Sequence, residues 1–275
     1  MAPGVPPLDG VLRPERAGSR SVRPGFRESG GVGSAAMRRS WVIPCYQEAE
    51  ALDAGLPKLL ALPGEEIVFV DDGSTDGTAE RLRRAAASDP RVRVVTHPRN
   101  RGVGAAMRSG FAASTGEVVV AYDADRTYPA EDAERLVAAV EAGADVAAAT
   151  PFAEGGTVDA GPFRAFLSHA ASAAYRLALG RRAGPVRTFT GGFRAYRGDL
   201  VRGLAFRSDG FPATAEILGL LCLGGARVVE VPSVLSTRSE GRSKMRVVRA
   251  SLGHLRVLFR LLDRRIALRR PAGGA

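Results

Sequence analysis

Two aspartates, Asp123 and Asp125, stand two residues apart at the end of the apolar run 118–122. Residues two apart in an extended chain point the same way, so both carboxylates are expected to face one pocket. Two carboxylates this close repel each other unless a cation lies between them. Mg²⁺ or Mn²⁺, shared with the phosphates of a substrate, suits such oxygen ligands. The alternative is a solvated turn, because aspartate is common at strand ends.

A second acidic pair lies earlier in the chain. Asp71 and Asp72 directly follow the apolar run 67–70 and precede a glycine-containing turn. Carboxylates at that place can accept hydrogen bonds from a ribose or a base. Gly102 and Gly104 resemble a fragment of the dinucleotide-binding fingerprint, but the full spacing and the downstream acid are absent. We therefore do not predict a dinucleotide-binding site.

Short apolar runs alternate with helical patterns through the middle of the chain. The runs are 41–44, 67–70, 92–96, 118–122 and 145–150, and helices are predicted at 49–62, 78–87, 103–114, 131–142 and 163–179. Short strands separated by helices indicate βαβ units and a buried, mostly parallel sheet of the α/β class. Ligands bind such sheets at the carboxyl ends of the strands, where both acidic pairs lie.

The net charge of +10 is distributed unevenly along the 275 residues. Residues 1–40 carry seven arginines against three acids, and residues 238–275 carry ten arginines and one lysine against two acids. The residues between them hold 21 bases and 24 acids, a net charge of −3. A basic groove through the body of the protein, and specific binding of nucleic acid with it, are therefore not expected.

Composition also suggests how the chain is organised. Proline, glycine, arginine and serine dominate residues 1–36, so 1–38 are expected to be a disordered extension, with Met37 as the natural start. Residues 39–237 are predicted to form one globular domain, and 238–275 a basic amphipathic helix and tail. Cys45 and Cys222 stand in apolar surroundings and are expected to be buried thiols. With no run of 18 apolar residues and no signal-peptide region, we expect a reduced, cytoplasmic protein without a transmembrane anchor.

The basic C-terminal segment has a helical pattern. Apolar residues recur at three- and four-residue spacing, at Met245, Val248, Leu252, Leu255, Phe259, Leu262 and Ile266. An adjacent stripe consists of Arg246, Arg249, Arg256, Arg260 and Arg264. Such a helix can lie in a membrane interface with its arginines on lipid phosphates. The alternative is a helix packed on the globular domain with its arginines in water.

The motifs together resemble a known family. Four segments occur in the order and spacing of family 2 glycosyltransferases with the GT-A fold: Pro44-Cys45-Tyr46-Gln47-Glu48, 70–78, 101–106 and Asp123-Ala124-Asp125. Segment 190–197 is similar to a stretch of the dolichol-phosphate mannosyltransferase group, and segments 210–216, 230–232 and 238–244 follow as they do there. The resemblance covers roughly residues 40–245 and implies a GT-A domain over 39–237.

The resemblance also implies roles for matching residues. The nucleoside of a GDP- or UDP-sugar would be held by Pro44, Tyr46, Glu48, Val70, Asp71 and Asp72, with the Mg²⁺ or Mn²⁺ on Asp123 and Asp125. The acceptor phosphate would contact Arg164, Ser168, Arg194 and Ser243. Arg238 and Lys244 match a basic motif near the phosphates, and Glu216 matches an acid that faces the sugar. The implied reaction is an inverting transfer of a mannose- or glucose-type sugar to a polyprenyl phosphate on the cytoplasmic face of a membrane.

Several observations bear on the acceptor. A phosphate monoester is already anionic at neutral pH and needs cations rather than a general base. His97, His169 and His254 are the only histidines and are expected to be structural or solvent-facing. Thr127, Pro151 and Thr188 differ from the pattern of the group, and the last two keep a soluble or protein-bound hydroxyl acceptor open. A membrane-protein partner of the enzyme is a further expectation. The alternative from another class is a catalytically idle membrane-binding or scaffold protein with the same fold.

Overall fold

A computed structural model describes residues 37–125, 128–129, 131–158, 162–235 and 247–268. The first half contains β1 (Arg39–Cys45), α1 (Ala49–Leu60), β2 (Glu66–Asp71), α2 (Thr78–Ser88), β3 (Val92–Thr96), α3 (Val103–Ala113), β4 (Val118–Ala121), α4 (Asp132–Glu141) and β5 (Val146–Thr150). The second half contains β6 (Thr157–Val158), α5 (Pro162–Leu179), η2 (Gly180–Ala183), β7 (Arg194–Arg197), α6 (Gly198–Arg202), α7 (Ala213–Leu223), β8 (Val228–Pro232), β9 (Val234–Leu235) and α8 (Val247–Ala267). The predicted strands and helices are all present, with ends that differ by a few residues.

Seven strands form one sheet in the order β3-β2-β1-β4-β7-β5-β8. All neighbouring pairs are parallel except those of β7, which runs antiparallel to both β4 and β5. The prediction of a mostly parallel sheet flanked by helices is confirmed. β6 and β9 pair separately in a small two-stranded sheet. The order brings the carboxyl ends of β1, β2 and β4 to one edge, so the acidic pairs that follow β2 and β4 lie at the same edge of the sheet.

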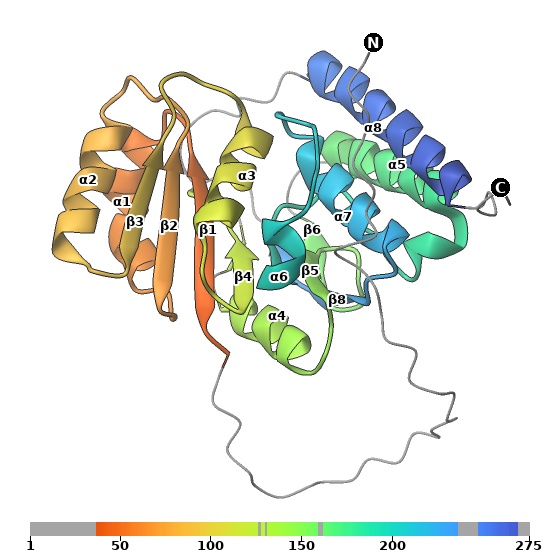
Figure 1. Cartoon of the computed structure of the whole chain (residues 1–275), viewed down its shortest axis with the longest axis horizontal. Coiled ribbons are helices and arrows are strands. Elements are labelled where there is room, and N and C mark those ends of the chain that lie inside the picture. Colours follow the sequence, from red (N-terminus) through yellow and green to blue (C-terminus); the bar gives the residue numbers. More distant parts are fainter. Residues whose placement is uncertain (1–36, 126–127, 130, 159–161, 236–246, 269–275) are drawn as a thin grey trace, which may run out of the picture.

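Helices cover both faces of the sheet (Figure 1). One core cluster joins the sheet to α1, α2 and α4, and it includes Cys45, Leu52 and Leu136. The other joins the opposite face to α3, α5, α7 and α8, and it includes Cys222, Val257 and Leu261. Both cysteines are buried thiols that take part in no disulfide, as predicted, and they lie in different clusters. Burial raises the pKa of the Cys222 thiol to about 12.

The C-terminal helix α8 packs alongside α5 and α7 (Figure 1). Val257 and Leu261 are fully buried in this contact. Gly219 of α7 permits the close approach, because a Cβ atom there would lie only 2.5 Å from Leu261 Cδ1. The hydroxyl of Tyr175 on α5 lies 2.8 Å from Nδ1 of His254. The helix therefore belongs to the same packed unit as the sheet, which agrees with the packed-helix alternative.

The face of α8 that packs is not the apolar stripe predicted from the sequence. In the described part of that stripe, Leu252, Leu255, Phe259, Leu262 and Ile266 are exposed, Phe259 by 68%. Phe166 and Leu177 of the neighbouring helix α5 are also exposed. Val257 and Leu261 make the core contact from a face of α8 that differs from both the apolar stripe and the arginine stripe. The apolar stripe therefore remains available for another surface. Among the described residues, no helix combines the length and apolar character needed to cross a bilayer.

Candidate active site

A cleft of about 850 Å³ opens at the carboxyl ends of β1, β2 and β4. Its first wall comes from the loops after these strands and the start of α3, and its second wall from segment 207–212 and α8. The lining side chains and backbone belong to Pro44, Cys45, Tyr46, Glu48, Asp72, Asn100, Arg101, Gly102, Val103, Ala106, Asp123, Ala124, Asp125, Arg207, Ser208, Asp209, Gly210, Phe211, Pro212, Ala250, Gly253, Arg256 and Arg260. Segments far apart in the sequence thus meet in one site.

Four of the residues predicted to hold the nucleoside line this cleft: Pro44, Tyr46, Glu48 and Asp72. Val70 and Asp71 do not line it. Val70 is buried in the core, and Oδ1 of the buried Asp71 accepts a hydrogen bond from the Ser74 backbone N–H at 3.1 Å. Alternation along the chain separates Asp71 from Asp72, since successive side chains point to opposite faces. Val70 instead packs within the sheet in the core cluster that includes Val42 and Val68. Asp71 therefore orders the turn, and Asp72 is the acid that faces the cleft.

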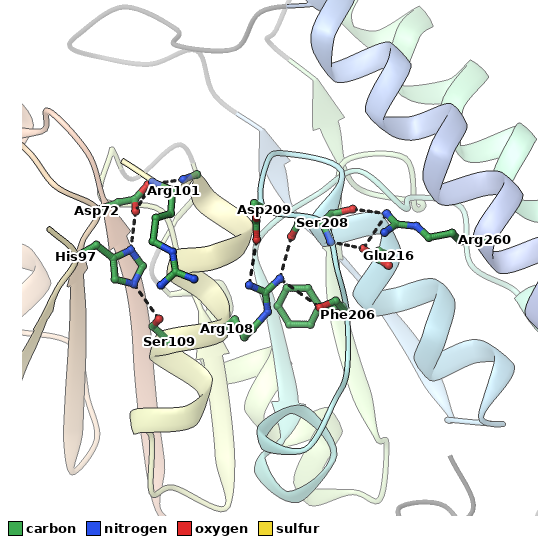
Figure 2. A network of polar contacts seen from close by, with 11 residues as sticks. Asp72, His97, Arg101, Arg108, Ser109, Phe206, Ser208, Asp209, Glu216 and Arg260 are labelled. Atoms are coloured by element: carbon green, nitrogen blue, oxygen red, sulfur yellow. Dashed lines mark hydrogen bonds and ion pairs between the residues drawn. The ribbon is translucent and has the colours of Figure 1, made fainter. Parts of the chain in front are cut away.

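Asp72 sits at the centre of a polar network (Figure 2). Its Oδ1 lies 2.6 Å from His97 Nδ1 and accepts from the Arg101 backbone N–H at 2.9 Å, and its Oδ2 accepts from the Gly102 N–H at 2.7 Å. Nε2 of His97 lies 2.8 Å from the hydroxyl of Ser109 on α3. His97 is thus structural, as expected, but it contacts a cleft residue. Its place after β3, one strand from β2, is the sequence signal for that contact.

Asp123 and Asp125 both line the cleft, as their spacing predicts. Burial, followed by the negative charge of Asp123, raises the pKa of the Tyr128 hydroxyl above its usual range. No cluster of three His, Cys, Asp or Glu ligands occurs among the described residues. Two carboxylates in a cleft fit a hard cation whose remaining ligands come from substrate phosphates and water. The donor set therefore fits Mg²⁺ or Mn²⁺ bound together with a diphosphate.

Segment 207–212, part of the second wall, contacts the start of α3 on the first wall. Gly102 has a φ of 99°, and a Cβ atom there would lie 2.3 Å from the carbonyl oxygen of Asp209, so only glycine fits this approach. Arg108 of α3 holds the same segment through an ion pair with Asp209, 3.0 Å from Nη1 to Oδ1. Its guanidinium also lies over the ring of Phe206, as Figure 2 shows. These contacts fix the second wall relative to the nucleotide side.

Arg194 lies in the protein interior rather than in the cleft lining. It is only 1% exposed, and its guanidinium donates to the carbonyl oxygens of Thr214 at 2.6 Å and Phe189 at 2.8 Å. A charge buried in this way is held by fixed backbone acceptors and cannot turn toward a ligand without losing them. Arg194 therefore stabilises the 188–193 turn against α7, and its guanidinium is not presented to the cleft, so its contact with an acceptor phosphate stays a prediction without support from this arrangement. Ser168 also lies outside the cleft lining, with its hydroxyl 2.7 Å from that of Thr190.

Glu216 lies behind the cleft wall rather than in it. Its Oε2 accepts from the Ser208 backbone N–H at 2.7 Å and lies 3.3 Å from Nη2 of Arg260 (Figure 2). The carboxylate is buried and thus holds two lining residues in place. The Glu216 carboxylate is therefore not placed to contact a sugar in the cleft. Arg238, Ser243, Lys244 and Thr127 lie outside the described residues, as does the side chain of Arg164 on α5.

The helix α8 contributes residues that the sequence did not place in the site. Ala250, Gly253, Arg256 and Arg260 line the cleft. Their three- and four-residue spacing puts them on one helical face, which is the signal that could have found them. Two members of the predicted arginine stripe thus face the cleft.

Residues 40–204, more than half of the chain, match the protein family described as Glycosyl transferase family 2. The chain belongs to glycosyl transferase family 2. A "Dolichol-phosphate mannosyltransferase" of Pyrococcus furiosus is 33% identical over 232 residues, which make up 82% of this chain and 64% of that protein. The chain thus spans less than two thirds of that relative. A "Polyprenol monophosphomannose synthase" of Mycolicibacterium smegmatis is 36% identical over 236 residues, 81% of this chain and 88% of that protein.

Solved structures agree on the fold of this family 2 member. The glucosyl-3-phosphoglycerate synthase of Mycobacterium tuberculosis, crystallised with Mn²⁺, uridine diphosphate and phosphoglyceric acid, superposes with a TM-score of 0.63. The superposition covers 87% of this chain and 81% of that chain, at 22% sequence identity. At this identity the likeness establishes the fold alone, which is of the GT-A type.

Proposed function

We propose that this family 2 protein transfers a hexose, of the mannose type, from a nucleotide-sugar to a polyprenyl phosphate at a membrane surface. The observation that carries the proposal is the meeting of Asp72, Asp123 and Asp125 in one cleft. Asp72 is set to hold the nucleoside, and the aspartate pair the diphosphate through a cation. The names of the relatives, which are mannosyltransferases of lipid phosphates, support the sugar and the acceptor.

In an inverting displacement, different residues of the cleft would bind different parts of the donor. Pro44, Tyr46, Glu48 and Asp72 would bind the nucleoside, and Asp123 and Asp125 would hold Mg²⁺ or Mn²⁺. The cation, when bound, offsets the negative charge that develops on the departing diphosphate. The nucleotide in the donor is GDP or UDP.

A phosphate acceptor fits the absence of a histidine base. None of the three histidines lines the cleft: His97 contacts Asp72, His254 contacts Tyr175, and the ring of the exposed His169 packs on Phe152. A hydroxyl acceptor would need a group to take its proton, whereas a phosphate oxygen is already anionic. Thr188 and Pro151, the positions that departed from the pattern, are buried outside the cleft lining, so their identity does not argue against a phosphate.

The exposed apolar stripe of α8 supports a peripheral position on the membrane, which we place at the cytoplasmic face. Leu255, Phe259 and Leu262 can enter the acyl boundary while the helix stays docked through Val257 and Leu261. This combines the two alternatives raised by the sequence, because one face of α8 packs and another is free.

The proposal is tested with purified protein, radiolabelled GDP-mannose, GDP-glucose, UDP-mannose or UDP-glucose, divalent metal, and vesicles that contain a polyprenyl phosphate. We expect label in the organic phase with a mannose donor, GDP-mannose or UDP-mannose, and not with the glucose donors. Matched vesicles with the free polyprenol, which lacks the phosphate, should give none. Label that stays in the aqueous phase on a soluble acceptor, or transfer to the free polyprenol, would contradict the lipid-phosphate acceptor.

A further inference from the structure

The second wall of the cleft carries a concentration of positive charge. Arg207, Arg256 and Arg260 all line it. Arg264 follows Arg260 by one turn, and burial together with the positive charges of Arg207 and Arg260 lowers its pKa, partly offset by the negative charge of Glu216. Glu216 pairs with Arg260, and Asp209 of the same wall pairs with Arg108. The arginines therefore outnumber the acids available to neutralise them.

Arg260 is oriented but only partly satisfied. Its Nη2 donates to the hydroxyl of Ser208 at 2.8 Å and lies 3.3 Å from Oε2 of Glu216, so the guanidinium is fixed in one direction. Among the described residues, its Nε is buried without a hydrogen-bond partner. A buried donor left unpaired is costly, and the guanidinium that carries it lines the cleft, where it has donor capacity left for an anionic ligand. Arg256, one turn earlier on the same face, is exposed in the cleft.

The two free faces of α8 match the two parts of a lipid phosphate. Leu255 and Phe259, each next to a cleft arginine in sequence, are exposed about 100° around the helix from Arg256 and Arg260. An acceptor whose tail lies along the apolar stripe would bring its head group around the helix to these arginines. The nucleotide residues stand on the opposite wall, so the donor has its own place in the cleft.

We propose that Arg256 and Arg260 bind the phosphate monoester of the acceptor and hold it in the cleft across from Asp123 and Asp125. This inference rests on the proposed function. Guanidinium groups form paired, charge-assisted hydrogen bonds with phosphate oxygens, and two of them on consecutive turns can hold one phosphate. The role is positioning the nucleophile, since the acceptor oxygen needs no proton removed.

The kinetic test compares Arg256→Gln, Arg260→Gln and the charge-conserving Arg260→Lys with the wild type. We expect the KM for polyprenyl phosphate to rise about 10- to 100-fold in the two glutamine variants, with partial recovery in Arg260→Lys. The KM for the sugar nucleotide should change less than about threefold. Arg176→Gln is the matched control, because Arg176 is an exposed arginine of α5 outside the cleft. A rise in the donor KM alone would assign the arginines to the diphosphate and overturn the proposal, as would no change in either KM.

A binding measurement separates this inference from the proposed reaction. Calorimetric titration with dodecyl phosphate below its micelle concentration needs no turnover, and dodecanol serves as the uncharged control. We expect wild type and Arg176→Gln to bind the phosphate, and both glutamine variants to lose at least tenfold in affinity. If the wild type transfers no sugar to polyprenyl phosphate, the proposed function fails, while this loss of binding would still support the arginine site. Equal binding by wild type and Arg256→Gln, whose exposed side chain leaves the fold intact, would overturn it.

Discussion

Nδ1 of His97 lies 2.6 Å from Oδ1 of Asp72, and Nε2 of the same ring lies 2.8 Å from the hydroxyl of Ser109. The imidazole thereby connects α3 to the acid that faces the nucleotide side of the cleft. A neutral ring can donate from Nδ1 to the carboxylate and accept at Nε2 from the serine. The arrangement orients Asp72 rather than supplying a base, because neither His97 nor Ser109 lines the cleft.

Removal of this support should weaken donor binding. We expect His97→Ala to raise the Kd of the sugar nucleotide about 3- to 10-fold, the cost of one lost orienting hydrogen bond. His97→Asn should recover part of the loss, because its amide can donate near the position of Nδ1. Calorimetric titration gives the Kd, and thermal melting checks that the variants fold. An unchanged Kd in folded His97→Ala would show that Asp72 needs no help from the ring.

The aspartate pair should be indispensable for transfer. We expect Asp125→Asn to abolish turnover and leave the fold intact, since the amide loses the charge that holds a divalent cation. Removal of divalent ions with a chelator should have the same effect on the wild type and be reversed by Mg²⁺ or Mn²⁺. The exposed Glu154→Gln, which lies outside the cleft, is the control. Undiminished turnover in Asp125→Asn would refute the metal role.

The exposed stripe of α8 should govern membrane binding. Leu255 and Phe259 point away from the core, so Leu255→Ser with Phe259→Ser should leave the fold unchanged and reduce binding to anionic vesicles about 10- to 100-fold. Sedimentation with vesicles measures the partition. Val234→Ser removes a comparably exposed apolar side chain from β9 and should have no effect. Truncation after Lys244 is less informative, because it also removes the buried Val257 and Leu261.

Adjacent leucines on α8 should differ sharply in their effect on stability. Leu261 is fully buried against Gly219 of α7, whereas Leu262 lies on the exposed stripe. We expect Leu261→Ala to lower the free energy of unfolding by about 2–5 kcal/mol, because it leaves a cavity between the helices. Leu262→Ala should cost less than about 1 kcal/mol. Urea denaturation followed by circular dichroism compares them. Equal effects would show that α8 does not dock through this face.

Stability should fall as the pH drops below the usual pKa of histidine. Burial lowers the pKa of His254, so the unfolded chain binds a proton there more readily than the folded protein. The free energy of unfolding should therefore decrease as pH falls from about 6.5, a pKa typical of free histidine. Burial raises the pKa of Glu230, which contributes in the opposite sense as pH rises from acid. Comparison of wild type with His254→Gln in urea at pH 7.5 and 5.5 isolates His254. A pH dependence that persists in His254→Gln would assign the effect elsewhere.

Local sequence patterns predicted much of the fold and part of the candidate site. The alternation of short apolar runs with helical patterns predicted the parallel sheet. This was possible because the side-chain repeat of a strand and that of a helix are both set by the backbone. The sequence also predicted the acids of the first wall of the cleft. Asp123 and Asp125 are spaced to share a face, Asp72 follows a strand, and parallel strands end at one edge of the sheet. The apolar periodicity of the last helix predicted an amphipathic helix, and the described residues of its apolar stripe are exposed together on one face.

Tertiary structure decided which of these residues face the cleft. Arg194 looked like a phosphate ligand in its motif, but antiparallel β7 turns it into the interior, where backbone carbonyls surround it. Arg256 and Arg260 looked like partners of the phosphates on a bilayer surface, but the docking of α8 on Gly219 places them in the cleft. Helical periodicity tells which residues share a face, whereas the contact made by another helix selects the direction of that face. That contact depends on residues far away in the chain, and no local pattern records it.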